Sequence, residues 1–267
     1  MDICSVCHTK PFNRSIMKRL VSFAMVCWAG IGVLFAQQMN QQSLLTGEEI
    51  RGIDVTGRWD IVITQGDQTG VKLEYDSALT EKYNVTCELD GTTVYLNVEN
   101  KDGSPNIEGP VMAYAYVTLS SLDKFRVFRG ACKITAKDTL TANHCDIHIV
   151  GVGDIENVSL KVQTLSYEQT GAAQISGLNI KAQEDVDIAI AGVGNCSDIS
   201  IRTAGDLQIK TKGVVRFAAD IDVNKVTVEA SSNMGKICLR GHAARKTVHS
   251  SPVKQIDLSQ LEVSDAQ

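Results

Sequence analysis

The stretches Ile147-His-Ile-Val-Gly-Val-Gly-Asp154 and Ile188-Ala-Ile-Ala-Gly-Val-Gly-Asn195 are nearly the same sequence. Their first glycines belong to a series at positions 130, 151, 171, 192, 213 and 235, spaced by 21, 20, 21, 21 and 22 residues. A fixed period of this kind is typical of proteins in which each unit buries its apolar face only against its neighbours. The pattern therefore predicts a chain built from stacked repeats.

The residues around each glycine alternate in character. The residue four places after the glycine is always apolar: Ile134, Ile155, Ile175, Cys196, Phe217 and Leu239. The residue before that one is nearly always polar: Lys133, Asp154, Gln174, Asn195, Arg216 and Cys238. Two places after the glycine the residue is small or apolar: Cys132, Gly153, Ala173, Gly194, Val215 and Ile237. Alternation with a period of two indicates β-strands.

Three short strands within about 21 residues leave no room for a helix, because helical repeats normally need over about 30 residues. The sequence therefore predicts an all-β fold: a parallel β-helix, or β-solenoid, with one rung per repeat and a right-handed winding by default. The glycines would occupy corners that a side chain would crowd. A phosphate-binding loop at Gly151-Val-Gly153 is disfavoured, because such a loop opens a helix and a strand follows here.

Residues 1–36 are predicted to be a secretory signal peptide, with Met17 as an alternative start. Arg14, Lys18 and Arg19 precede an apolar run that ends at Ala36, and this run is short for a membrane-spanning helix. Its removal leaves 22 basic and 30 acidic residues, a net charge of −8, which argues against nucleic acid as a partner. We expect no transmembrane helix in the mature chain and an exported location: periplasm, cell surface or extracellular space.

Four further regions are expected in the mature chain. Residues 37–47, rich in Gln and Ser, are predicted to form a flexible stalk, and residues 48–128 an irregular N-terminal β region that caps the solenoid. Within it, Val85 to Val98 predicts a hairpin that turns at Asp90-Gly91. The rungs are expected over residues 129–259 and a C-terminal tail over residues 260–267. The five cysteines after residue 36 are predicted to be mostly free, buried thiols.

The pattern Ile53-Asp-Val-Thr-Gly, then Asp60-Ile-Val-Ile-Thr-Gln-Gly66, then Val71-Lys-Leu-Glu-Tyr-Asp76, followed by glycine-marked segments, resembles the head GIN domain of putative auto-transporter adhesins. The resemblance covers about residues 48–259. It implies a β-helical exported protein and supplies no catalytic residues. We expect no translocator barrel, so the resemblance is not taken to imply autotransport.

The outer face offers two candidate pairs of polar residues. Asp146 and Asp187 would lie two rungs apart, about 9.6 Å, near the upper limit of carboxylate separations in inverting glycosidases. Asp154 and Asn195 form a similar pair with Gln174 between them. Polar columns are also expected on the solvent-exposed side of any solenoid, whatever its function. His144 and His148 are too far apart on a strand to share a metal, and His242 and His249 have no ligand cluster near them in sequence.

No catalytic, cofactor-binding or metal-binding residues are therefore assigned, and no cofactor is expected. The sequence favours an exported, non-enzymatic, adhesin-like binding module of the bacterial cell envelope, with a glycan or a cell-surface protein as its partner. The alternative is a carbohydrate-active β-helix enzyme that hydrolyses or cleaves polysaccharide.

Overall fold

The computed structural model describes residues 39–104, 113–251 and 256–264. Residues 1–36, predicted to be a signal peptide, lie outside these ranges. Nearly all described residues belong to strands, in the order β1 (Met39–Leu44), β2 (Gly52–Gln65), β3 (Gly70–Asp76), the short helix α2 (Leu79–Lys82), β4 (Tyr83–Asp90), β5 (Thr93–Asn100), β6 (Ala113–Leu119), β7 (Lys124–Ala136), β8 (Thr139–Ala182), β9 (Val186–Asn233), β10 (Ile237–Ser251) and β11 (Ile256–Val263). The prediction of an all-β chain is confirmed.

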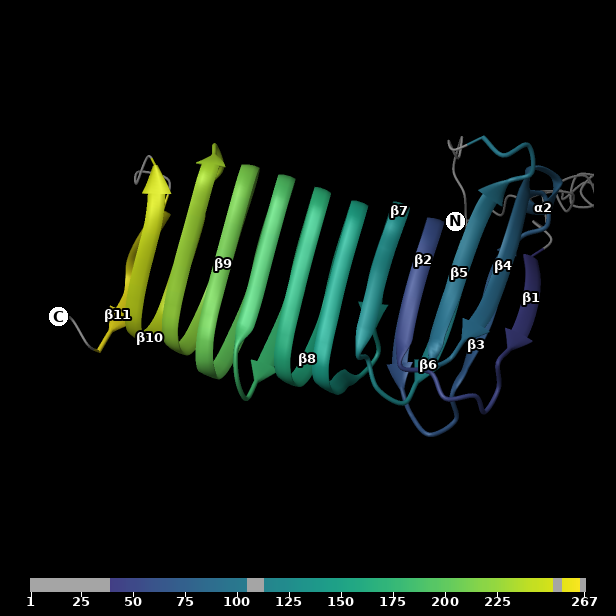
Figure 1. Ribbon diagram of the computed structural model, residues 1–267, viewed down its shortest axis with the longest axis horizontal. Coiled ribbons are helices and arrows are strands. Elements are labelled where there is room, and N and C mark those ends of the chain that lie inside the picture. The colour runs from purple at the N-terminus through teal and green to yellow at the C-terminus, as the bar shows by residue number, and fades with distance from the viewer. Residues whose placement is uncertain (1–38, 105–112, 252–255, 265–267) are drawn as a thin grey trace, which may run out of the picture. The chain divides into compact units, whose positions relative to one another are not determined.

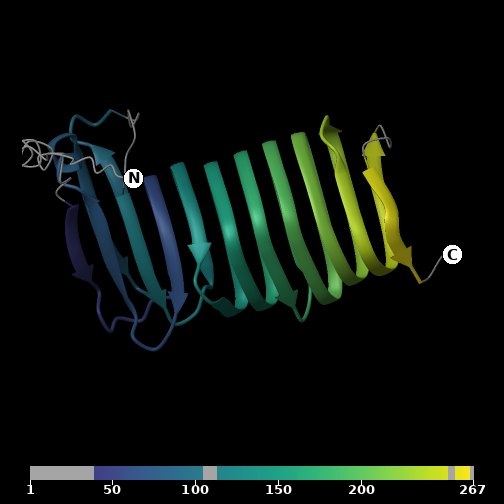
Figure 2. The same ribbon diagram turned by 180° about the vertical axis from the view of Figure 1, so that it is seen from behind.

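The strands form one large, mostly parallel sheet. Its order runs β1, β3, β6, β2, β7, β8, β9, β10, β11, with β5 also beside β2 and β4 beside β5. Pairing is antiparallel between β1 and β3, β3 and β6, and β4 and β5, and parallel from β2 through β11. Figures 1 and 2 show β8, β9 and β10 as long ribbons that turn repeatedly, so that their segments lie side by side.

The predicted register holds over the middle of the chain. Between β8 and β9, Gly171 lies beside Gly192, and Ile175 beside Cys196, an offset of 21 residues. Ile175 and Cys196 are both 1% exposed, whereas Gln174 is exposed. The inward and outward sides are therefore as predicted, and the inward side chains form one continuous apolar cluster.

The register predicted for the last glycine is wrong. Gly235 does not continue the column of Gly213, because a Cβ on Gly235 would lie 1.9 Å from the carbonyl oxygen of Val215. Ile237 pairs with Phe217, and Leu239 pairs with Ala219 instead. Paired residues in β9 and β10 are therefore 20 positions apart, whereas Gly213 and Gly235 are 22 apart. Aligning these two glycines placed the predicted register two residues out.

The glycine column instead extends in the other direction. Gly57 in β2 pairs with Gly130 in β7, and both have positive φ, 95° and 126°. A Cβ on Gly130 would lie 1.8 Å from the carbonyl oxygen of Gly57. Backbone stacked this closely excludes any side chain, so glycine is required at the corner.

A second corner follows a few residues later. Asn157, Gly177 and Asp198 all have positive φ, between 52° and 70°, and a Cβ on Gly177 would lie 2.7 Å from the amide oxygen of Asn157. Asn, Asp and Gly are the residues that tolerate this left-handed conformation. The backbone thus bends at two chemically distinct columns.

Three boundary predictions need correction or comment. The flexible stalk over residues 37–47 is wrong for residues 39–44, which form β1 and pair with β3. The tail over residues 260–267 is wrong for residues 260–263, which belong to β11 and pair with β10. Strand β7 crosses the predicted boundary after residue 128, and both regions share one sheet. The hairpin is confirmed, with Cys87 opposite Leu96.

Candidate functional site: a groove where the glycine column ends

The glycine column ends at Gly57, where the neighbours of β2 separate. On one side β2 pairs with β5 up to Thr56 and with β6 from Asp60 onward. Strand β5 continues from Asn97 to Asn100 while β2 bends at Gly57. Because β2 bends while β5 continues, the two strands separate, and the corner opens into a groove.

This groove has a volume of about 890 Å³, within the range of about 300–1,000 Å³ typical of ligand sites. Its charged and amide side chains come from three strands that are distant in sequence: Arg58 from β2, Glu99 and Asn100 from β5, and Arg129 from β7. Arg58, Glu99 and Arg129 are exposed. The remaining lining is Thr56, Gly57, Val98, Gly103, Ser104, Gly130 and Ala131.

A second hollow of about 250 Å³ adjoins the groove and shares Thr56 and Glu99 with it. Two aromatic side chains line this hollow and stay exposed, Tyr95 at 38% and Phe128 at 53%. The two exposed rings offer flat apolar faces beside the polar groups of the hollow. The two hollows together, called the corner groove below, combine flat apolar faces with charged hydrogen-bonding groups.

Two oxygen atoms in the wall of the second hollow lack a hydrogen-bond partner. Asp54 is 3% exposed, and Lys124 Nζ lies 3.2 Å from its Oδ2, but its Oδ1 has no partner. Asn97 Oδ1 also lacks a hydrogen-bond partner, and Asp54 and Asn97 both line the hollow. A buried acceptor without a donor costs about 1–3 kcal/mol, so this wall has unused capacity to accept hydrogen bonds.

The chemistry of the corner groove suits binding. Guanidinium groups donate paired hydrogen bonds to carboxylates, and carboxylates and amides accept from hydroxyls. Aromatic faces pack against the C–H face of a sugar ring. The lining residues of both hollows include no Ser, Cys or Lys placed beside a histidine, the pairing that activates a nucleophile.

The two acids of the pair considered from the sequence, Asp146 and Asp187, have different neighbours in the structure. Asp146 forms an ion pair with Arg126 at 3.2 Å, and Asp187 lies beside Ser166 in the neighbouring strand. The guanidinium of Arg126 thus occupies the carboxylate of Asp146, and neither acid lines the corner groove.

The column containing Asp154, Gln174 and Asn195 continues toward β2. Gln174 lies beside Asn195, and Asp154 beside Lys133, which lies beside Asp60. Burial raises the pKa of both Asp60 and Asp154. Lys133 bonds at 2.8 Å to Glu156 in the adjacent column, so this acidic cluster already contains its own counter-charge.

The histidines of the described residues have different neighbours. His144 contacts Thr164 Oγ1 at 2.7 Å, His148 lies beside Arg126, and His249 lies beside Glu229. His242 places Nδ1 3.4 Å from Asp222 and Nε2 2.5 Å from Ser264 Oγ.

The Ser264–His242–Asp222 contacts resemble a proton relay, but they lie at an exposed position. The side chains of His242 and Asp222 are 44% and 63% exposed, so water screens the carboxylate. His242 lines neither hollow of the corner groove. Within those residues no group of three His, Cys, Asp or Glu side chains could hold a metal ion.

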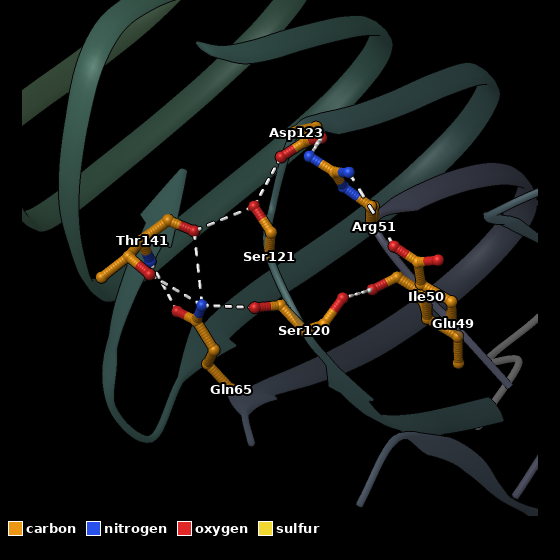
Figure 3. Close-up of polar contacts among 8 residues, drawn as sticks. All are labelled: Glu49, Ile50, Arg51, Gln65, Ser120, Ser121, Asp123 and Thr141. Atoms are coloured by element: carbon orange, nitrogen blue, oxygen red, sulfur yellow. Dashed lines mark hydrogen bonds and ion pairs between the residues drawn. The ribbon is translucent and has the colours of Figure 1, made fainter. Parts of the chain in front are cut away.

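A further polar cluster, drawn in Figure 3, joins β2 to the start of β8. Gln65 donates to Ser120 O at 2.6 Å and accepts from the Thr141 backbone N–H at 2.6 Å. Asp123 accepts from Ser121 and pairs with Arg51 at 2.7 Å. These side chains bond to one another and to the backbone, so the cluster fixes the connection between the strands instead of presenting free groups to a ligand.

The fold and groove define an all-β protein with a mostly parallel sheet and a surface suited to binding. The chain belongs to the family described as putative auto-transporter adhesin, head GIN domain, which matches residues 50–203. A comparison with curated proteins finds no significant match. The described part of the chain contains no helix long and apolar enough to cross a bilayer.

Several solved structures share the fold. The crystal structure of a putative adhesin from Bacteroides fragilis NCTC 9343 is 16% identical with a TM-score of 0.58, covering 80% of this chain and 94% of that one. A putative lipid binding protein from Parabacteroides distasonis ATCC 8503 is 17% identical with a TM-score of 0.51, covering 83% and 97%. A putative adhesin from the same organism is 14% identical with a TM-score of 0.50, covering 80% and 94%.

Proposed function

We propose that this protein is an exported, adhesin-like binding module, built on a parallel β-solenoid, that holds an acidic glycan in the corner groove without turning it over. The observation that carries the proposal is the meeting of Arg58, Arg129 and Glu99 with the exposed rings of Tyr95 and Phe128 in adjoining hollows. Guanidinium groups would bind the sugar carboxylates, and the rings would pack on sugar faces.

Family membership supports a binding role, because the family is described by its adhesins. Export is supported by the charged and apolar pattern of residues 1–36. A long rigid sheet also suits glycan binding, because a preformed surface loses little conformational entropy when a ligand binds.

Two other functions receive less support from the structure. An enzyme would need a paired acid and base, and Asp146 is held by Arg126. A lipid carrier would need an internal cavity, yet the enclosed space among the core residues Phe125, Leu160 and Tyr167 is only about 20 Å³. That volume is too small for an acyl chain.

The test is a calorimetric titration of the purified protein with oligogalacturonides, an acidic probe, and with neutral galactan oligosaccharides of the same length. We expect the acidic probe to bind with a dissociation constant between about 10 μM and 1 mM, which is weak because few residues carry the energy. The neutral probe should bind at least about 10-fold more weakly, because it offers no carboxylate to the arginines.

Phe128→Ala and Arg129→Ala should each weaken binding of the acidic probe by about 10-fold. Val193→Ala and Lys181→Ala, which alter exposed residues away from the groove, serve as matched controls and should bind as the unaltered protein does. Equal binding by all four variants would contradict the assignment of the site. Release of new reducing ends at substoichiometric protein would contradict binding without turnover.

A further inference from the structure

The two hollows of the corner groove differ in charge. The first hollow is lined by the two arginines Arg58 and Arg129 together with Glu99. The charged residues that line the second hollow are all acidic: Asp54, Glu88 and Glu99. Glu88 and Glu99 are exposed, so their carboxylates stand at the rim of the second hollow. A ligand group that suits the first hollow is therefore a poor match for the second.

The buried wall of the second hollow can accept hydrogen bonds but has no donor to spare. The two cations next to Asp54 are already engaged: Lys124 Nζ lies 3.2 Å from Asp54 Oδ2, and Arg126 pairs with Asp146. The oxygens that remain without a partner, Asp54 Oδ1 and Asn97 Oδ1, are both acceptors. Asp54 is only 3% exposed, so a group that bonds to this wall has to be a donor.

Two aromatic rings stand on either side of this wall. Strand β2 lies between β5 and β7 (Figure 1), and Asp54 pairs with Tyr95 on one side and with Arg126 on the other. Phe128 follows in β7 and lines the same hollow as Tyr95. Strands β5 and β7 are two strand spacings apart, about 9.6 Å. A compact group bound over β2 would therefore have an aromatic ring on each side.

We propose that the second hollow binds the primary ammonium group of an amino sugar. An ammonium group has three N–H donors and no acceptor, which matches a wall with two unpartnered acceptors, Asp54 Oδ1 and Asn97 Oδ1. A cation is attracted to the faces of aromatic rings, here those of Tyr95 and Phe128. The carboxylate of Glu88 adds negative charge at the rim.

The inference rests on the proposed function for the glycan, and it narrows that glycan to one that carries both charges. Its carboxylate would lie against Arg58 and Arg129, and its amine would lie in the adjoining hollow, which shares Thr56 and Glu99 with the first. A lysine side chain offers the same ammonium group. It has no sugar ring for the aromatic faces to cover, so an amino sugar is the better match.

The experiment is calorimetry at about pH 6, where amines are protonated, with three tetramers: chitosan, which carries amines, chitin, in which the amines are acetylated, and lysine. We expect the chitosan tetramer to bind at least about 10-fold more tightly than either of the others. Equal binding of chitosan and chitin would overturn the ammonium site. Tetralysine that binds as tightly as chitosan would overturn the assignment to an amino sugar.

Variants of the protein separate the site from general attraction between a cationic probe and an acidic protein. Glu88→Gln should weaken binding of the chitosan tetramer by about 10-fold, and Asn97→Ala by about fivefold. Glu262→Gln makes the same charge change at an exposed residue of β11 and should leave binding unchanged. Thermal midpoints of all three variants confirm that they are folded. Equal losses in Glu88→Gln and Glu262→Gln would overturn the proposal.

The two probes distinguish this inference from the proposed function. Binding of oligogalacturonides without binding of the chitosan tetramer would reject the ammonium site and leave the acidic glycan in place. Binding of the chitosan tetramer without binding of oligogalacturonides would support the ammonium site and reject the acidic glycan.

Discussion

Gly171 lies so close to Gly151 that a Cβ atom on Gly171 would be 2.2 Å from the carbonyl oxygen of Gly151. The same contact recurs between Gly192 and Gly171 at 2.1 Å. Here a glycine is required twice over, once by its positive φ of 124° and once by the backbone of the next segment. The corner therefore fixes how closely neighbouring segments can stack.

Gly171→Ala is expected to destabilise the protein by at least about 3 kcal/mol, since backbone must move to admit the methyl group. Gly91→Ala is the matched control, because Gly91 also has positive φ, 58°, but a Cβ there meets nothing within 4 Å. It should cost only about 1 kcal/mol, the conformational part alone. Chemical denaturation of both variants measures the difference. Equal losses would mean that the stacked backbone does not constrain the corner.

Ile175→Asp should cost several kcal/mol, because Ile175 is 1% exposed and lies beside Cys196. A carboxylate there would be neutralised or would admit water into the core. Gln174→Asp changes the exposed neighbour and should cost under about 1 kcal/mol. If the denaturation midpoint of Gln174→Asp were the lower of the two, the assignment of inward and outward sides would be wrong.

The cysteines at 87, 132, 145, 196 and 238 are all free. Burial raises the pKa of Cys132, Cys145 and Cys196 to about 12. At pH 8 these three should resist alkylation in the native protein, since the thiolate is the reactive form. In denaturant without reductant, all five should be labelled. Mass spectrometry of the alkylated peptides distinguishes the cases, and a disulfide-linked pair would refute the expectation.

Asp220 links three segments through Arg202 and Arg240. The hydrogen bond from Arg202 lowers the pKa of Asp220, and Arg240, at 3.2 Å, lowers it further. A folded-state pKa below the usual 3.8 adds stability above about pH 4, and this stability is lost as pH falls through the lowered value. Since the carboxylate is a third exposed, Asp220→Asn should cost no more than about 1 kcal/mol at pH 7.

The pH dependence provides the check on that prediction. As the pH falls through the lowered pKa of Asp220, the difference in unfolding free energy between Asp220→Asn and the unaltered protein should shrink toward zero, because both then carry a neutral group. Asp222→Asn, at a neighbouring and more exposed position, should show a smaller difference at pH 7. A cost for Asp220→Asn that stays constant with pH would rule out the charged contacts as its source.

The sequence predicted the register in the middle of the sheet, because the stacked corner there has no space for a Cβ atom and so requires one residue type. Only glycine fits the stacked corner, so its spacing reported the offset between Gly171 and Gly192 directly. The second corner was missed because Asn157, Gly177 and Asp198 share a backbone conformation and not a residue type. The sequence pattern aligned Gly235 with Gly213 because both are glycines. In the structure Gly235 lies beside Val215 instead, so it does not belong to the glycine column.

The corner groove could not be found from local patterns. Its walls come from residues 56–58, 98–104 and 129–131, which only the topology brings together. The turn at Gly57, where the groove begins, could be recognised from the sequence as a glycine within a strand pattern. Its pairing with Gly130 could not, because 73 residues separate the two glycines. The irregular strands between them hide the repeat. The partner of His242 was similarly hidden, since Asp222 lies 20 residues away in the adjacent strand.

The most direct test of the binding site is an NMR titration of isotope-labelled protein with oligogalacturonides. If the corner groove binds acidic glycans, the backbone amide signals of Arg58, Glu99, Asn100 and Arg129 should shift together, with one saturation curve, while those of Val193 and Lys181 stay in place. The Phe128→Ala variant should show the same shifts only at about 10-fold higher ligand. Saturable shifts confined to another surface, or none at millimolar ligand, would contradict the proposed site.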